Sequence, residues 1–230
     1  MFNQPTLEKI DIPRGTSIPA AYYDESYYAG LPKANWNKPY TWNNMKPTFA
    51  VWAAFLLSAF PEAESFLDVG CAKGFLERAL IETIGINRRR SLEMTGFDFS
   101  EHAIANAEEK AKPFLECASV DDFKFKRDYD ILISLDLFEH LTEKQVRSFL
   151  LRSREHINDC GFFCIATDNE MNRAEPSHIT LQDYNWWNEL FLDCGWILDD
   201  EMVEFRKVML KNTFISNSYS EIFIYSSGKL

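Results

Sequence analysis

The chain has 230 residues, of which 46% are hydrophobic and 15% aromatic, which is enough apolar material for one domain with a complete core. Acidic residues outnumber basic ones by 35 to 24, so the formal net charge is −11. This balance argues against a broad electrostatic surface for nucleic acid or anionic lipid and fits a small neutral or cationic substrate better. The longest apolar run, residues 49–60, is too short to cross a bilayer, so no membrane span is expected.

The cysteines and the first residues of the chain bear on its compartment. The cysteines are Cys71, Cys117, Cys160, Cys164 and Cys194. They form an odd set without a Cys-x-x-Cys pair, mostly in apolar segments, which predicts free and buried thiols. Residues 1–20 have neither a basic start nor an apolar run, so no secretory signal is expected. The sequence therefore predicts a cytoplasmic protein and leaves the oligomeric state open.

An aromatic-rich arm, residues 1–44, precedes the main domain, residues 45–230. The large rings of the arm are Tyr22, Tyr23, Tyr27, Tyr28, Trp36, Tyr40 and Trp42. Two interpretations stay open, because rings with polar groups can form a lid that stacks on an acceptor and excludes water, or can simply pack the arm on the domain. Pro47 then predicts the start of a helix that ends at Pro61 and covers one side of a sheet.

A strand, a glycine-bounded turn and a helix follow one another around Gly70. Gly70 and Gly74 bracket the turn, and because they lack a Cβ they let the backbone come close to a ligand. Asp68, at the end of the strand, would fix this loop and receive an ammonium group. A dinucleotide fingerprint fails here, because Ala72 and Phe75 stand where its second and third glycines belong. The turn therefore predicts a nucleotide-type cofactor that carries an amino acid end rather than phosphates.

The second strand, residues 94–99, ends in another carboxylate. Asp98 lies 24 residues beyond Gly74, a spacing at which a βαβ cofactor unit places an acidic side chain on both ribose hydroxyls. Ser100 is placed to cap the helix that begins at Glu101. Together with the glycine turn, Asp98 strengthens the prediction of a nucleoside cofactor.

The later segments predict the rest of a sheet and its helices. Further strands are expected at residues 114–118, 129–135, 161–167, 196–205 and 221–226. The fourth strand of the sheet is nearly continuously apolar, which is typical of a central parallel strand buried on both faces. The predicted fold class is α/β, a Rossmann-like seven-stranded, mostly parallel sheet with helices on both faces and an antiparallel last strand.

Sequence patterns predict two helices near the end of the domain. Thr142 begins one of them, with Gln145 three residues later as a capping box. A later helix is expected to turn Trp186, Leu190 and Cys194 inward.

Three of these stretches resemble the motifs of class I S-adenosylmethionine-dependent methyltransferases of the ubiquinone-pathway type. They are the glycine turn 68–74, the run Gly-Phe-Asp-Phe-Ser at 96–100 and the run Asp-Leu-Phe-Glu-His-Leu at 136–141. The resemblance covers residues 45–205 and implies S-adenosyl-L-methionine as the cofactor. The residues that it assigns to the cofactor are Asp68, Gly70, Cys71, Ala72, Gly74, Asp98, Phe99, Ser119, Val120 and Leu135.

The adenine contact leaves alternatives open. The resemblance places Ser119 and Val120 at the adenine, where the family commonly has an acidic residue at the first of these positions. Asp121 could replace that acid after a shift of two residues, and a capped surface turn accounts for the same residues equally well.

Methyl transfer from a sulfonium needs an aligned acceptor and, for a hydroxyl, a base. His178 is the best candidate, because it follows the fifth strand in the loop that overhangs the transferred methyl, although an isolated histidine can equally be structural. Asp136 and His140 face the same mouth from the end of the fourth strand and complete the predicted catalytic set. The sequence itself assigns no metal ligand.

A metal is nevertheless an open alternative. Asp136, Glu139, His140 and His178 resemble the acid-x-x-Glu-His arrangement with a distant histidine of metal-assisted O-methyltransferases. Such a site would hold a divalent cation that orients and acidifies a substrate hydroxyl. Against it, Glu139 and His140 could serve only to anchor the following helix.

The predicted function is O-methylation of a small hydroxylated metabolite, such as a sugar or a secondary-metabolite intermediate. N-methylation of a small amine is the near alternative. A protein that binds S-adenosylmethionine without catalysis, and uses the arm for a partner, is the alternative from another class.

Overall fold

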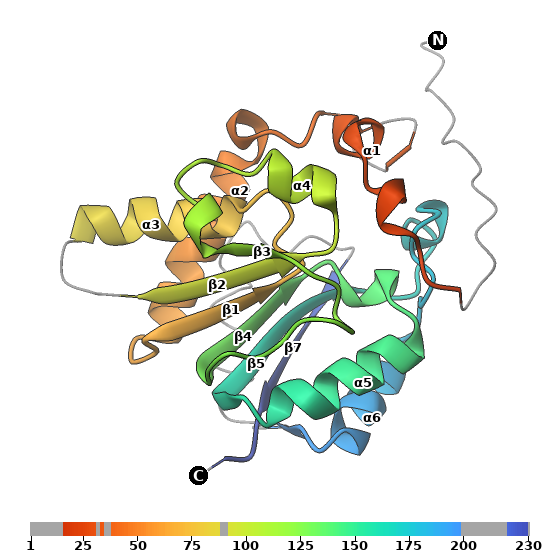
Figure 1. Cartoon of the computed structure of the whole chain (residues 1–230). Helices are drawn as coiled ribbons and strands as arrows, with labels where there is room; N and C mark the ends of the chain where they lie inside the picture. Colours follow the sequence, from red (N-terminus) through yellow and green to blue (C-terminus); the bar gives the residue numbers. More distant parts are fainter. Residues whose placement is uncertain (1–15, 31–32, 35–37, 88–91, 199–219, 230) are drawn as a thin grey trace.

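The computed structural model describes residues 16–30, 33–34, 38–87, 92–198 and 220–229. They form a seven-stranded sheet in the order β3-β2-β1-β4-β5-β7-β6 (Figure 1). The strands are β1 Ser65–Val69, β2 Glu93–Asp98, β3 Leu115–Cys117, β4 Tyr129–Leu135, β5 Ile157–Ala166, β6 Ile197–Leu198 and β7 Ser220–Ser226. β1 to β5 pair in parallel, whereas β7 runs antiparallel to both β5 and β6. The predicted fold class is confirmed.

Helices cover both faces of the sheet (Figure 1). The helices are α1 Glu25–Ala29, α2 Trp42–Ala59, α3 Phe75–Asn87, α4 Glu101–Ala105, α5 Glu143–Arg154 and α6 Tyr184–Asp193. Side chains of α2 and α3 form one core with the sheet, and those of α5 and α6 form a second core on its other face. β1 is buried at every position and β4 at nearly every one, because both lie in the middle of this sandwich.

The capping box predicted at Thr142 is present at the start of α5, where Gln145 and Thr142 bond each other's backbone N–H. The cysteine prediction is also confirmed: all five thiols are free, and four of them are buried, with Cys117 exposed.

The predicted start of α2 at Pro47 is wrong, because the helix begins at Trp42 and contains Pro47. Trp42 is buried, with its ring 5.8 Å from Phe75 and the Arg78 guanidinium 4.1 Å from its centroid. This tertiary packing stabilises a first helical turn that the proline signal alone did not reveal, at the cost of one backbone hydrogen bond.

Two other local expectations need correction or fall partly outside the described residues. Leu190 and Cys194 are buried as predicted, but in α6 Trp187 is fully buried in place of Trp186, which is only partly buried. Of the strand expected at 196–205, the structure shows Ile197–Leu198 as β6, and the rest lies outside the described residues.

The arm packs against the domain through its tyrosines. Tyr22, Tyr23, Tyr27 and Tyr28 are buried and form a third apolar cluster with Ala103 of α4 and Ile179, among others. Trp36, also counted among the arm's rings, lies outside the described residues. Within the described part of the chain, none of the helices combines the length and the apolar character needed to cross a membrane.

Candidate functional site

A cavity of about 1400 Å³ opens beside the loops that follow β1, β2, β4 and β5. Loops after the carboxyl ends of parallel strands are where ligands bind in open α/β sheets. The arm and α2 supply the opposite wall, through residues such as Tyr28, Tyr40 and Trp52. The volume exceeds the roughly 300–1,000 Å³ of a pocket for one small ligand, so there is room for a cofactor and an acceptor together.

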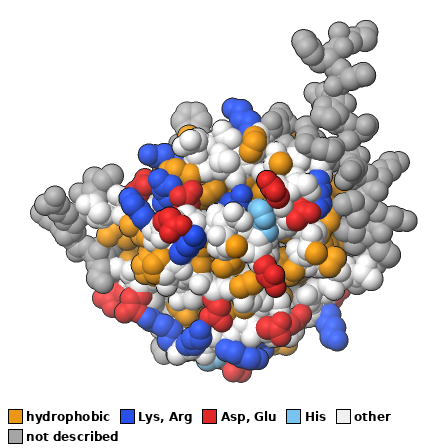
Figure 2. All heavy atoms as spheres, turned by 45° about the horizontal axis from the view of Figure 1, so that its top comes forward, with side chains coloured by type: hydrophobic (Ala, Val, Ile, Leu, Met, Phe, Trp, Pro, Cys, Tyr) orange, Lys and Arg blue, Asp and Glu red, His pale blue; other side chains and the backbone are white. Residues whose placement is uncertain are grey.

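The surface on the side of the arm carries no block of positive charge within its described part. Figure 2 shows Lys and Arg side chains scattered among acidic and hydrophobic ones there. This pattern agrees with the acidic balance of the whole chain and is unlike a nucleic-acid interface.

The turn after β1 needs the small residues that the sequence places in it. Gly70, Ala72 and Gly74 all have positive φ, of 82°, 47° and 70°. A Cβ on Gly74 would lie 2.7 Å from the Cβ of Ala111, so a larger residue would push the loop off the domain. The N–H groups of Gly70 and Cys71 donate to the carbonyl of Phe97, which ties the loop to the end of β2.

Asp98 organises the same loop from β2. Its Oδ2 accepts from the Ala72 N–H at 3.0 Å and its Oδ1 from the Ser100 N–H at 2.8 Å. Burial raises the pKa of this carboxyl, and the two backbone hydrogen bonds oppose the rise. Each carboxylate oxygen has a further lone pair, so Asp98 can still accept hydroxyl donors from a ligand in the cavity.

Most residues assigned to the cofactor line this cavity, and three do not. Gly70, Ala72, Asp98, Phe99, Ser119, Val120 and Leu135 line it. Asp68, Cys71 and Gly74 are not among the lining residues, and both Asp68 and Cys71 are buried.

In the adenine turn, Ser119 is a capping residue. Its Oγ donates to Asp122 at 2.6 Å and accepts from the Asp122 N–H. Asp121 is exposed and accepts a hydrogen bond from Gln145. The turn therefore has the geometry of a capped turn while still presenting Ser119 and Val120 to the cavity.

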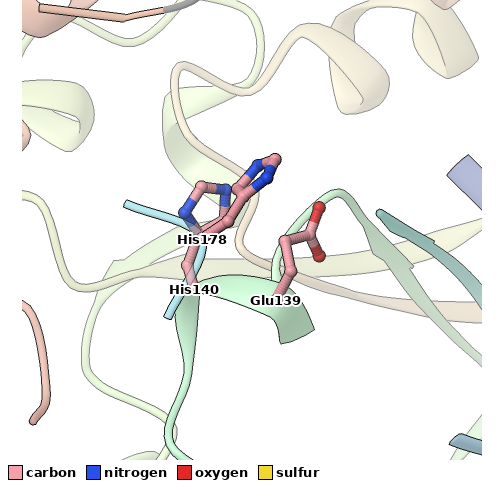
Figure 3. A group of neighbouring side chains, drawn as sticks. All are labelled: Glu139, His140 and His178. Carbon is pink, nitrogen blue, oxygen red and sulfur yellow. The ribbon is translucent and has the colours of Figure 1, made fainter. Parts of the chain in front are cut away.

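Glu139, His140 and His178 come together at the other end of the cavity (Figure 3). One ligand atom from each lies within 4.8 Å of the others. His140 Nδ1 lies 3.0 Å from the carbonyl of Ser177, and His178 Nδ1 lies 2.9 Å from that of Asn172. A carbonyl only accepts, so each Nδ1 carries a proton, and each Nε2 is left with a free lone pair.

Burial keeps both rings neutral. It lowers the pKa of His178 to about 4, and it lowers the pKa of His140 well below its ordinary value, with His178 as a second cause. Glu139 is fully buried, and its Oε1 accepts from the Ala166 N–H at 3.2 Å. Its Oε2 has no hydrogen-bond partner among the described residues. Burial also raises the pKa of Glu139 well above its ordinary value, with Asp136 as a second cause.

Asp136 lies apart from this cluster, although it lines the cavity. Its backbone has a positive φ of 51°, and its Oδ1 accepts from Ser220 Oγ at 2.8 Å and from Cys164 Sγ at 3.7 Å. The structure therefore brings together three of the four residues of the sequence pattern and joins Asp136 to β5 and β7 instead.

The sequence interpretation missed lining residues from loops and from the end of the chain. Asn172, Glu175 and Ser220 line the cavity without having been singled out. A polar loop at the carboxyl end of β5 was the available signal for the first two. Ser220 had none, because its position depends on the antiparallel pairing of β7 with β5.

Comparisons with known proteins identify the class of this domain. Residues 66–161 match the family model described as a methyltransferase domain. Over 124 residues the chain is 27% identical to a ubiquinone biosynthesis O-methyltransferase of Rickettsia canadensis (strain McKiel), a match that covers 51% of this chain and 48% of that protein. The chain thus spans about half the length of this curated relative.

Solved structures agree on the fold. The magnesium protoporphyrin IX methyltransferase of Synechocystis PCC 6803, solved with bound S-adenosylmethionine, superposes with a TM-score of 0.56 at 16% identity over 80% of each chain. A plantazolicin methyltransferase in complex with S-adenosylhomocysteine gives a TM-score of 0.56 at 13% identity, over 80% of this chain and 87% of that one.

These matches support a class I S-adenosylmethionine-dependent methyltransferase. Its matched segment begins in β1, includes the glycine turn and Asp98, and ends in β5. The family and the S-adenosylmethionine cofactor predicted from the sequence are confirmed.

Proposed function

We propose that the protein transfers the methyl group of S-adenosylmethionine to a hydroxyl of a small hydroxylated metabolite, such as a sugar or a secondary-metabolite intermediate. The observation that carries this proposal is the pair of neutral imidazoles, His140 and His178, that share one cavity with the glycine turn. The similarity to a ubiquinone biosynthesis O-methyltransferase supports transfer to oxygen.

In this proposal the glycine turn and β2 hold the cofactor. Asp98 accepts the ribose hydroxyls with its remaining lone pairs, and Ser119 and Val120 lie at the adenine. Leu135 and Phe99 supply apolar contacts from the ends of β4 and β2. Asp68, Cys71 and Gly74 shape the loop from below, which agrees with their place outside the cavity lining.

His178 is the general base. The acceptor oxygen attacks the sulfonium methyl in line, the carbon–sulfur bond breaks, S-adenosylhomocysteine leaves, and the hydroxyl proton passes to His178 Nε2. The Asn172 carbonyl fixes the ring orientation through Nδ1. His140 lies next to it, with ring centroids 4.8 Å apart, and can share the acceptor hydroxyl. Asp136 lines the same cavity but is not part of the group formed by Glu139, His140 and His178.

The arm closes the acceptor end in the manner of a lid. The Tyr23 ring centroid lies 6.1 Å from that of His140 and 5.3 Å from that of Phe99, so it spans both halves of the cavity. Its backbone carbonyl accepts from Ser100 Oγ at 2.7 Å. Lys73 of the glycine turn donates to the Tyr40 carbonyl and lies 4.7 Å from the Tyr28 ring. These contacts support a lid that excludes water from the reaction.

The charges of the lining favour a neutral or cationic acceptor. Among the described lining residues, Lys38 is the basic one, and the acidic ones are Asp98, Asp136, Glu139, Glu175 and Glu221. A phosphorylated or carboxylated acceptor would meet these carboxyl groups in a partly buried space, where repulsion is strongest.

A metal-assisted form of the reaction is a second candidate, favoured by the partnerless Oε2 of Glu139. Glu139, His140 and His178 would hold a divalent cation, and both Nδ1 atoms already bond to carbonyls as those of metal-bound histidines do. The cation would orient a substrate hydroxyl and lower its pKa. Chelator treatment followed by Mg²⁺ or Mn²⁺ separates the forms, since the general-base form keeps its turnover throughout.

The test of the proposed function is turnover with matched acceptors. The full chain is incubated with S-adenosylmethionine and a panel of sugars, phenols and small amines, and mass spectrometry detects methylated products. Methylation of a hydroxyl supports the proposal. Methylation of amines alone shows an N-methyltransferase, and tight S-adenosylhomocysteine binding without turnover of any acceptor shows a noncatalytic protein.

A further inference from the structure

Glu77 is a buried carboxyl in a position where the helix otherwise turns apolar side chains inward. It lies in the first turn of α3, beside the buried Leu76, Ala79 and Leu80, and is 1% exposed. No cationic side chain bonds to its carboxyl among the described residues, and the groups that interact with it are its own backbone N–H and the Asp68 carboxyl. Such a group costs stability, so its presence calls for a reason other than packing.

The Glu77 carboxyl lies directly under the glycine turn. A Cβ on Gly96 would collide with Glu77 Oε1, so the carboxyl fills the space that this glycine leaves on β2. Glu77 Oε2 would lie 3.7 Å from a Cβ on Gly74. Gly96 stands opposite Asp68 in the parallel pairing of β2 with β1. The two acidic side chains are therefore neighbours below the loop.

Among the residues that the structure describes, no cationic group acts on this pair. The other titratable groups that face it are Cys71, Asp98 and Tyr40, from the loop, β2 and the arm. Arg78, next to Glu77 in the chain, instead bonds to Glu82 and Glu108. Two carboxyls side by side in a site without cations do not both ionise at neutral pH.

The electrostatics agree with this geometry. Burial, with Asp98 adding to it, raises the pKa of Asp68 to about 7. Burial and then Asp68 raise the pKa of Glu77 well above its ordinary value. The pair thus gains or loses a proton in the neutral range.

We propose that Asp68 and Glu77 form a carboxyl pair that shares one proton beneath the glycine turn, and that release of a proton from the pair strengthens binding of the amino acid end of the cofactor. The inference rests on the proposed cofactor site. Negative charge below the loop attracts the cofactor's ammonium group, whereas a nucleoside without the amino acid end carries no positive charge for the pair to attract. Glu77 is a positioning residue, because it acts through Asp68 and the loop.

The test uses two ligands that differ only at that end. S-Adenosylhomocysteine carries the amino acid, and 5′-methylthioadenosine is the same thionucleoside without it. Calorimetric titration of the full chain is run from about pH 6 to about pH 7.5, which lies below the α-amino pKa of about 7.7–8.0, so the ligand's amino group stays mostly protonated. At neutral pH each titration is repeated in two buffers of different ionisation enthalpy, which counts the protons released.

For the wild type we expect S-adenosylhomocysteine affinity to rise about fivefold or more across this range, with release of part of a proton on binding. 5′-Methylthioadenosine should show neither effect. In Asp68→Asn the ionising group is gone, so S-adenosylhomocysteine should bind more weakly and its affinity should be nearly independent of pH. In Glu77→Leu, Asp68 loses the hydrogen bond that opposes the rise of its pKa, so the increase in affinity should move to higher pH. Glu82→Gln, on the same helix but partly exposed, should behave as the wild type.

Equal pH dependence for the two ligands in the wild type would overturn the inference, and this comparison needs no variant to fold. An unchanged pH dependence in a folded Asp68→Asn or Glu77→Leu protein would overturn it as well. Absence of binding by both ligands would instead overturn the proposed cofactor site, together with the inference that rests on it.

Discussion

The two ends of the cavity are built in different ways. The end proposed for the cofactor is made of a turn and strand ends that lie between residues 68 and 120. Backbone N–H groups of this turn are bonded to Phe97 and Asp98. The acceptor end collects side chains from the arm, from the loop after β4, from the loop after β5 and from β7. One end is defined by backbone shape, and the other by side chains that meet only in the folded chain.

The polar groups of the two ends also differ in whether the protein supplies their hydrogen-bond partners. At the cofactor end Asp98 has donors on both oxygens. At the acceptor end Glu139 Oε2 has no hydrogen-bond partner among the described residues, and one ligand atom each of Glu139, His140 and His178 lies within 4.8 Å of the others. Protein donors thus hold both oxygens of Asp98 in place before a ligand arrives. The group at the acceptor end can still take a proton or a cation. Substitutions at the two ends should therefore separate binding from turnover.

The largest effect is expected at the acceptor end. His178→Ala should lower turnover by roughly 10²–10⁴, the scale for loss of a positioned general base, while S-adenosylhomocysteine affinity stays near that of the wild type. Steady-state rates and calorimetry on the same preparation measure both. His156→Ala is the control, since His156 stacks on Phe125 and lies outside the cavity lining. Full turnover in His178→Ala would remove this histidine from the mechanism.

The cofactor end should show the opposite pattern. Asp98→Ala should weaken S-adenosylhomocysteine binding by about 1.5–3 kcal/mol, the range for hydrogen bonds to a charged group, and leave the domain folded. Calorimetry gives the affinity and circular dichroism the fold. Asp128→Ala, an exposed aspartate in an ion pair with His156, should leave the affinity unchanged. An Asp98→Ala protein that binds normally would place the ribose elsewhere.

The arm joins the two ends, and its removal should affect turnover more than folding. Deleting residues 1–34 takes away the four clustered tyrosines and leaves Tyr40, which stacks on Phe75 at 4.8 Å, together with α2. We expect one cooperative unfolding transition to remain while turnover falls about tenfold or more, because water enters the acceptor end. Loss of the cooperative transition would show that the rings are needed for the core rather than for closure.

The smallest effect concerns pH. Because burial lowers the pKa of His178 to about 4, this base stays neutral well below the ordinary histidine range. Turnover at saturating S-adenosylmethionine should therefore change little from about pH 8 to about pH 6 and decline only as the pH approaches the lowered value. Saturation removes any pH dependence of cofactor binding. A decline centred near the ordinary histidine pKa would show that the base is exposed during turnover.

The sequence was most informative where one short segment makes a whole structural unit. Gly70, Gly74 and Asp98 could be assigned to a cofactor loop because strand, turn and helix follow one another and fix their own geometry. The start of α2 was misjudged, because the burial of Trp42 against α3 outweighs the local signal of Pro47. The same holds for the inner side of α6, where packing against the sheet selected Trp187.

The sequence by itself determined the α/β fold, the family and the cofactor, since alternating strands and helices and a glycine turn are local patterns. Only the tertiary structure decided that Glu139 joins His140 and His178, that Asp136 bonds to Ser220 instead, and that Glu77 lies beside Asp68. These relations depend on which segments the sheet order and the arm bring together. Contacts between residues so far apart in the chain leave no periodic pattern in the sequence, because they arise only when the folded core fixes the positions of the loops.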